Sequence, residues 1–272
     1  MSGAVTLSLR APVDEAVDLD GVTADRCATL SAVEIASLPI WVGRLQASVG
    51  DLFDVRGERS DRLRVEGSLR RVSGLAAGMA GGELLVDGDA GDRVGAAMTG
   101  GWVDVRGDVG DDAGLAMAGG ALRITGSAGH RAGSAAPGAS RGMTGGEIVI
   151  NGSAGDEVAA RARRGLVVVG GDAGPHAARA ILAGTLVVIG RTGAHAGRGS
   201  KRGSIVALGG IDVPATYQYA CTYQPPHLRL TFTYLYRRYG LSVDDRVLDG
   251  RFRRYCGDGG EIGKGEILVL TN

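Results

Sequence analysis

Glycine recurs every 19 residues through the middle of the chain. One column of glycines begins at Gly82 and reaches Gly120, seven further residues delay its next member to Gly146, and the 19-residue spacing then continues to Gly203. A second column, which begins at Gly88, keeps the same spacing and shares the same insertion point. Columns in one register are the signature of a repeat protein whose units stack on one another.

Each repeat contains a short apolar run between glycines. Runs such as GGWVDVRG and GGALRITG alternate with a period of two, and later runs such as RGLVVVGG are rich in β-branched residues, both of which are typical of a β-strand. Nineteen residues are too few for a strand and a full helix in every unit. We therefore predict an all-β fold, a right-handed parallel β-helix with one coil per repeat and a cap at each end. The side chains expected to point inward are Leu84, Val86, Val103, Val105, Leu122, Ile124, Ile148, Ile150, Val167, Val169, Leu186, Val188, Ile205 and Ala207.

The glycines after each strand follow the pattern GxxGxxxG, as in Gly88, Gly91 and Gly95. Glycine permits positive φ at corners and lets stacked turns approach closely. A phosphate cradle would instead need one strand that leads directly into a helix. The sequence shows no Ser-His-Asp spacing, no isolated carboxylate pair and no metal-ligand cluster, so we predict neither catalytic residues nor a metal site in this chain.

Composition narrows the class of protein. The 48 glycines follow the repeat, so their number indicates stacked turns rather than disorder. A formal net charge of zero gives no general attraction to nucleic acid. There is no apolar run of membrane-spanning length and no signal-peptide pattern, and the three cysteines form no CxxC motif. We expect a cytoplasmic protein with no nucleic-acid or membrane partner.

Three regions follow from the repeat pattern. Residues 1–61 are expected to form an N-terminal cap with approach strands, residues 62–210 the repeats, and residues 211–272 a C-terminal cap. The elements expected in the two caps are a strand at VTLSLR (5–10), a short helix over 31–37, a strand at LFDVRG (52–57), a helix over 227–239 and two strands within 251–270.

Two columns of charged side chains stand out. One corner column, in which the charges alternate over four repeats, comprises Arg93, Asp112, Arg131, Glu157, His176 and His195, and we interpret it as a ladder of favourable pairs. A second group of six cations is expected toward the same end of the solenoid, where guanidinium groups would suit an anionic chain or an acidic partner. This basic cluster comprises Arg163, Arg164, Arg179, Arg198, Lys201 and Arg202.

The outward face of the strands changes character along the chain. Early repeats point polar side chains outward, such as Asp87, Asp104 and Arg123. Later repeats point apolar ones, and a sheet that is apolar on both faces must be covered. We expect the C-terminal segment to cover part of this face and a partner protein to contact the rest. The predicted partner-contact residues are Val149, Leu166, Val168, Val187, Ile189, Val206 and Leu208.

The string M-x-G-G-x-x-x-V/I-x-G-x-x-G resembles a known family. It occurs at Met79–Gly91, Met98–Gly110, Met117–Gly129 and Met143–Gly155. Together with LFDVRG and the tail FRRYCGDGGEIGKGEILV, it is similar to the C subunit of formylmethanofuran dehydrogenase and to its bacterial counterpart in the formyltransferase/hydrolase complex. A more distant likeness is the C-terminal GxxGxxxG domain of glutamate synthase.

The resemblance implies a subunit without catalytic residues of its own. The companion A, B and D subunits, which include amidohydrolase-like and formyltransferase chains, would carry the chemistry. The carrier implied is methanofuran or methylofuran, whose glutamate-rich tail is polyanionic and would suit the basic cluster. The Ala-, Arg- and Gly-rich composition favours the bacterial version, which acts in tetrahydromethanopterin-linked formaldehyde oxidation in methylotrophs, although the dehydrogenase version stays open.

Three functions are therefore open at the level of sequence. The first is a scaffold subunit of a one-carbon enzyme complex. The second is a glutamate synthase-like β-helix domain that supports an amidotransferase. The third is an independent polymer-binding β-helix, which would need an aromatic stripe along the repeats. Only Trp102 provides an aromatic side chain on the outer face of a repeat strand.

Overall fold

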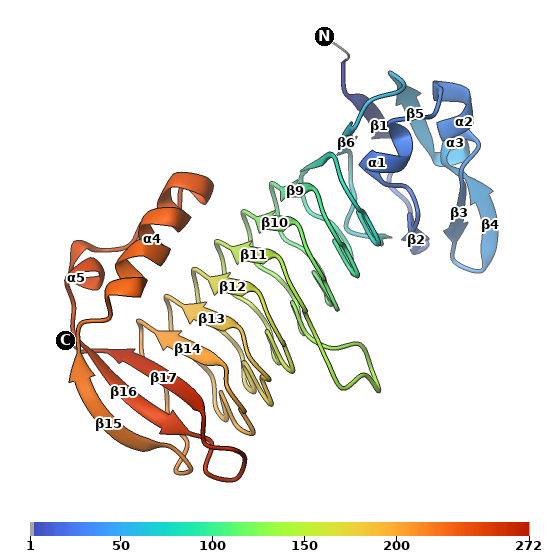
Figure 1. Ribbon diagram of the computed structural model, residues 1–272. Helices are drawn as coiled ribbons and strands as arrows, with labels where there is room; N and C mark the ends of the chain where they lie inside the picture. Colours follow the sequence, from blue (N-terminus) through green and yellow to red (C-terminus); the bar gives the residue numbers. More distant parts are fainter. Residues whose placement is uncertain (1–2, 272) are drawn as a thin grey trace.

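The structure is a computed structural model that describes residues 3–271 and is mainly β, with a few short helices (Figure 1). Its largest element is a 13-stranded, mostly parallel sheet, as the repeat pattern predicts. The strands of this sheet, in spatial order, are β15 (Gln218–Tyr223), β16 (Phe252–Gly257), β17 (Gly265–Leu270), β14 (Ser204–Ala207), β13 (Thr185–Val188), β12 (Leu166–Val169), β11 (Glu147–Ile150), β10 (Ala121–Ile124), β9 (Trp102–Val105), β8 (Glu83–Asp87), β6 (Arg62–Glu66), β1 (Val5–Leu9) and β5 (Phe53–Arg56).

Equivalent residues of successive repeats pair directly. Leu84 pairs with Val103, Val103 with Leu122, and Leu122 with Ile148 across the seven-residue insertion. A second column of parallel bridges links the following turns, from Leu69 through to Thr192. Each repeat therefore adds one strand and one bridge to its neighbour, and Figure 1 shows the resulting stack of turns.

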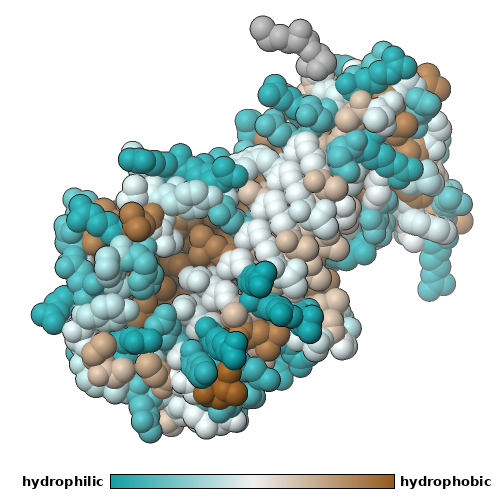
Figure 2. Space-filling model, viewed as in Figure 1, coloured by the Kyte–Doolittle hydropathy of each residue, from teal (hydrophilic) through white to brown (hydrophobic). Residues whose placement is uncertain are grey.

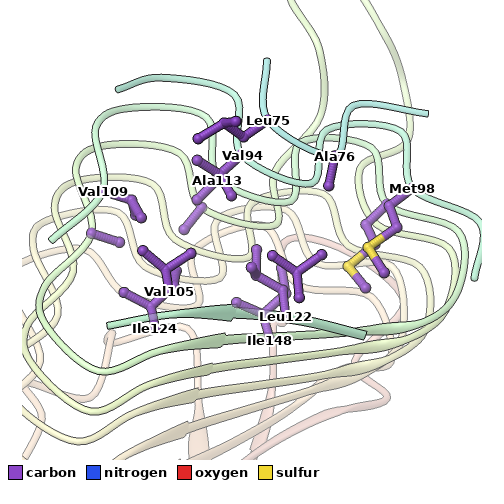
Figure 3. Close-up of a cluster of buried hydrophobic side chains, with 14 of the residues drawn as sticks. Leu75, Ala76, Val94, Met98, Val105, Val109, Ala113, Leu122, Ile124 and Ile148 are labelled. Carbon is purple, nitrogen blue, oxygen red and sulfur yellow. The ribbon is translucent and has the colours of Figure 1, made fainter. Parts of the chain in front are cut away.

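The interior of the stack is filled by the residues that the alternation assigns to it. All fourteen predicted inward side chains are buried. In Figure 3, Val105 and Ile124 lie one above the other, as do Leu122 and Ile148, and Met98 closes one side. Because every repeat supplies the same positions, one hydrophobic core runs the length of the stack.

The N-terminal region adds strands to the same sheet. The expected strands at 5–10 and 52–57 are β1 and β5, and β1 pairs in parallel with β6. The expected helix is α2 (Ala32–Ala36), which begins with a capping box between Ser31 and Glu34. The other N-terminal elements are α1 (Ala24–Cys27), α3 (Val49–Leu52) and a four-stranded sheet of β4 (Leu45–Ser48), β3 (Pro39–Val42), β2 (Val17–Asp18) and β7 (Val72–Ser73).

The C-terminal region also continues the sheet. The two expected strands are β16 and β17, and β17 pairs in parallel with β14, in the place that a further repeat would take. The expected helix is α4 (Pro226–Tyr239), which ends at Gly240 in the left-handed conformation. A short helix, α5 (Asp245–Leu248), follows it.

One glycine column shows how closely the repeats stack. A Cβ built at Gly100 would lie 2.2 Å from the carbonyl oxygen of Ala80, and one at Gly119 would lie 2.2 Å from that of Thr99. Gly81, which holds the same position in the repeat that begins at Met79, has nothing within 4 Å of such a Cβ. The close approach therefore calls for glycine at Gly100 and Gly119 but not at Gly81, and later repeats hold Arg164, Ala183 and Arg202 at this position.

Candidate functional site

The six residues of the basic cluster all have exposed side chains. They lie in three consecutive connections, those that lead into β12, β13 and β14. Backbone hydrogen bonds from Arg163 to Met143, from Leu182 to Ala162 and from Lys201 to Ile181 join these connections in register. Arg163 and Lys201 therefore share a column, two repeats apart.

The cations of the basic cluster are only partly neutralised. Arg179 pairs with Glu157 at 2.9 Å, and Lys201 lies 3.8 Å from Glu261. The other four, within residues 3–271, have no carboxylate oxygen within 4.0 Å, and they are Arg163, Arg164, Arg198 and Arg202. A surface of this kind attracts anions through guanidinium groups that remain available for new hydrogen bonds.

A buried carboxylate fixes one end of this surface. Asp258 is 3% exposed and accepts hydrogen bonds from the backbone N–H groups of Gly199 (2.8 Å) and Gly260 (2.9 Å). Burial by itself raises the pKa of Asp258. The two N–H donors and the nearby Arg198 outweigh burial and hold this pKa below its ordinary value. The C-terminal tail is thus tied to the connection that carries Arg198 and Lys201.

The corner column forms the predicted ladder only in part. Arg131 binds Asp112 through two hydrogen bonds of 2.8 Å, and this pairing raises the pKa of Arg131. Arg93, however, pairs with Asp18 of β2 at 2.5 Å. The sequence could not reveal this pairing because Asp18 lies 75 residues away and outside the repeats.

The two histidines of the column stack on each other. The ring centroids of His176 and His195 are 5.2 Å apart with an interplanar angle of 23°. No third His, Cys, Asp or Glu joins them in a group that could hold a metal, as far as the described residues extend.

The chain's own C-terminal helices cover much of the apolar outer face. Val149, Val168, Val187 and Val206 are buried in a second hydrophobic core, together with α4, α5 and the strands of the tail. These four valines therefore contact a segment of the same chain in place of the expected partner. Leu166, Ile189 and Leu208 are only partly buried, and Figure 2 shows hydrophobic surface still visible along the flank of α4.

A polar cluster holds α4 on the sheet. Glu147 of β11 accepts hydrogen bonds from Tyr234 and Tyr239, and the guanidinium of Arg238 lies 3.6 Å from the same carboxylate. The ring of Tyr239 stacks on Trp102 of β9, with centroids 5.4 Å apart, and Arg238 lies 4.9 Å above the Trp102 ring. Burial and the hydrogen bond to Glu147 raise the pKa of Tyr239.

Sequence reasoning did not identify this cluster. Its members are brought together by the packing of α4, and the hydrogen-bonding partners of Glu147 lie 87 and 92 residues further along the chain. The available signal was Glu147 itself, because it is a carboxylate in an outward position where the following repeats place Leu166, Thr185 and Ser204.

The fold and the basic cluster define a mainly β repeat protein. Its own C-terminal helices cover much of the outer face of the sheet, and the basic cluster is exposed. In the part of the chain that the structure describes, no helix has the length and apolar character needed to span a membrane. A scan against models of protein families finds no match.

Individual relatives do match. Over 89 residues the chain is 37% identical to the C subunit of the formyltransferase/hydrolase complex Fhc of Methylorubrum extorquens, covering 33% of this chain and 34% of that protein. Over 87 residues it is 30% identical to the C subunit of the tungsten-containing formylmethanofuran dehydrogenase 2 of Methanococcus maripaludis, covering 31% and 32% respectively. The chain thus spans about a third of the length of the curated relatives that it matches.

The structural match extends over the whole chain. A chain of the crystal structure of the Methylorubrum extorquens formyltransferase/hydrolase complex, solved in complex with methylofuran, superposes with a TM-score of 0.89 and 36% identity. The match covers 98% of this chain and 100% of that one. The chain belongs to the family formed by the C subunits of formylmethanofuran dehydrogenase and of the formyltransferase/hydrolase complex.

Proposed function

We propose that this chain is a non-catalytic scaffold subunit of a formyltransferase/hydrolase complex. The observation that carries the proposal is the whole-length match to a chain of such a complex, at 36% identity and a TM-score of 0.89. In this proposal the repeats 62–210 form a right-handed parallel β-helix, which the caps 1–61 and 211–272 close. Companion subunits supply the formyltransferase and hydrolase chemistry.

The companion subunits would contact the apolar surface that α4 leaves open. Leu166, Ile189 and Leu208 are the predicted contact residues that keep exposed surface. Exposed apolar patches of this kind are typical of protein–protein interfaces. This proposal therefore assigns the row of outer valines to the chain's own helix and the two flanks of that row, one with Leu166 and the other with Ile189 and Leu208, to a partner.

The basic cluster would hold the anionic tail of a methylofuran-type carrier. The relative's complex binds methylofuran, and the tail expected for such a carrier is rich in glutamate. Four of the six cations have no carboxylate partner within the described chain, so they can donate to carboxylates of a ligand. The tail would follow the column from Arg163 to Lys201 along the stack.

Affinity purification of the tagged chain from its native cell tests the scaffold role. Mass spectrometry should find formyltransferase and amidohydrolase-like chains together with a furan carrier. Replacement of Ile189 by Glu should reduce the retained companions, whereas Thr125→Glu, on the outer face outside the covered region, should not. A chain that is monomeric and retains no companion would contradict the scaffold role.

The carrier site is tested in the same purification. Replacing Arg163, Arg164, Lys201 and Arg202 by Ala should lower the amount of carrier retained per complex, while the companion subunits stay in place. Unchanged carrier content would overturn the tail-binding proposal and leave the scaffold role standing.

A further inference from the structure

A cavity of about 490 Å³ opens beside the seven-residue insertion. In Figure 1 the insertion is the loop between β10 and β11 that projects furthest from the stack. The loop residues Ser134–Gly138 form one wall, and the facing wall includes Arg131, Arg161 and Arg179. The volume lies within the range of small-molecule sites, roughly 300–1,000 Å³.

Arginine side chains from three repeats line the cavity. Arg131 uses its Nε and one Nη for Asp112, and Arg179 donates one Nη to Glu157. Arg161 donates one Nη to the carbonyl oxygen of Ala139, at 2.8 Å. Within residues 3–271, Arg161 has no carboxylate within 4.0 Å. Each guanidinium carries five N–H donors, so all three retain donors for a ligand.

Arg161 is exceptional among the repeats. Its backbone is left-handed, with φ of 57°, and the equivalent positions of other repeats hold Ala97, Ala116, Ala180 and Gly199. At this corner a long cationic side chain therefore occurs, within the described residues, in the repeat that follows the insertion, whereas Arg93 and Arg131 are left-handed at a different corner of their repeats. The hydrogen bond to Ala139 joins Arg161 and the loop into one unit.

The loop does not neutralise these cations. Its wall consists of small uncharged residues, and residues 135–142 contain Arg141 but no Asp or Glu. Three guanidinium groups and the carboxylate of Glu157 line the cavity, and Asp112 pairs with Arg131 from outside the lining. A loop that served only to shield the arginines would be expected to supply carboxylates. The insertion loop instead leaves the guanidinium of Arg161 without a carboxylate within 4.0 Å in residues 3–271.

We propose that this cavity is a binding site for a small multivalent anion, with carboxylate or phosphate groups held by Arg131, Arg161 and Arg179. Guanidinium forks match both kinds of group, and the walls offer no large apolar surface for another class of ligand. Arg179 belongs to both the basic cluster and this cavity, whereas Arg161 and Arg131 lie outside the basic cluster. The proposal does not require the chain to act in a one-carbon complex.

Titration calorimetry of the full chain with citrate and with pyrophosphate tests the site. Arg161→Gln should weaken binding at least tenfold, and Arg191→Gln, which alters an exposed arginine that does not line the cavity, should leave it unchanged. Tighter binding of citrate would assign a carboxylate ligand and tighter binding of pyrophosphate a phosphate ligand.

Glu157→Gln provides a test in the opposite direction. It removes the single carboxylate that lines the cavity and frees Arg179, so anion affinity should rise severalfold. This result does not depend on whether the Arg161 variant folds. Absence of binding by the unaltered chain, or equal affinity in Arg161→Gln, Glu157→Gln and the unaltered chain, would overturn the proposal. The carrier test remains distinguishable, because it replaces Arg163, Arg164, Lys201 and Arg202, none of which lines this cavity.

Discussion

Tyr234 of α4 donates its hydroxyl to Glu147 of β11, with both carboxylate oxygens 2.8 Å away. Tyr239 donates to the same carboxylate, so one side chain of the sheet holds two tyrosines of the helix. Residues of α4 pack with the buried outer valines in the second hydrophobic core, so this polar contact joins the helix to the sheet beside that core.

Removing the Tyr239 hydroxyl should loosen α4 without unfolding the repeats. Tyr239→Phe keeps the stacking on Trp102 but removes a donor from Glu147, and we expect a cost of about 1–3 kcal/mol. Hydrogen exchange in residues 226–239 should rise about fivefold or more, while β8–β10 are unchanged. Tyr236→Phe is the control, because that side chain is 62% exposed. Equal exchange in both variants would show that the contact does not hold the helix.

A charge on the inward face should disrupt the stack. Val103 is fully buried, and Val103→Asp would place a carboxylate without a partner in the core, at a cost of at least about 4 kcal/mol. Thr125→Asp, at an exposed outward position, should change the melting temperature by little. An unchanged melting temperature for Val103→Asp would mean that the inward register is wrong.

Alanine should be harmful at Gly119 and tolerated at Gly81, although the two glycines hold the same position in their repeats. Gly119→Ala would bring a methyl group to 2.2 Å from the Thr99 carbonyl oxygen, and overpacking of this kind costs about 1–3 kcal/mol. Gly81→Ala meets nothing within 4 Å and should be tolerated. Chemical denaturation of the two variants checks the difference, and similar losses of stability would contradict it.

The stability that Asp258 contributes, by joining the C-terminal tail to the backbone of Gly199, should depend on pH. Its pKa is lowered in the folded chain, so its contribution to stability is present above the ordinary value of 3.8 and is lost as pH falls through and below that value. Asp258→Asn should lower stability by about 1–3 kcal/mol at pH 7. The difference from the unaltered chain should shrink at pH 3. A difference that is constant from pH 7 to pH 3 would rule out this role of the carboxylate.

The repeats could be predicted from the sequence because their signals are local. The alternation that buries Leu84 and Val86 and the spacing that sets the register both lie within one 19-residue unit. The caps were less predictable, since nothing near Val5 indicates that β1 pairs with β6 across more than 50 residues. The same limit applies to sites. The exposure of the basic cluster follows from its composition, whereas the pairing of Arg93 with Asp18 and the contacts of Glu147 depend on distant segments.

The length of α4 sets how many repeats the covered part of the stack can contain. Its 14 residues span about 21 Å, close to the roughly 24 Å covered by the five strand spacings from β14 to β9. One more repeat between β11 and β14 would move Glu147 and Trp102 out of reach of Tyr239. The length of α4 does not limit the number of repeats between β6 and β9. The stack can therefore gain or lose repeats at its N-terminal end, while the number of repeats covered by α4 stays fixed.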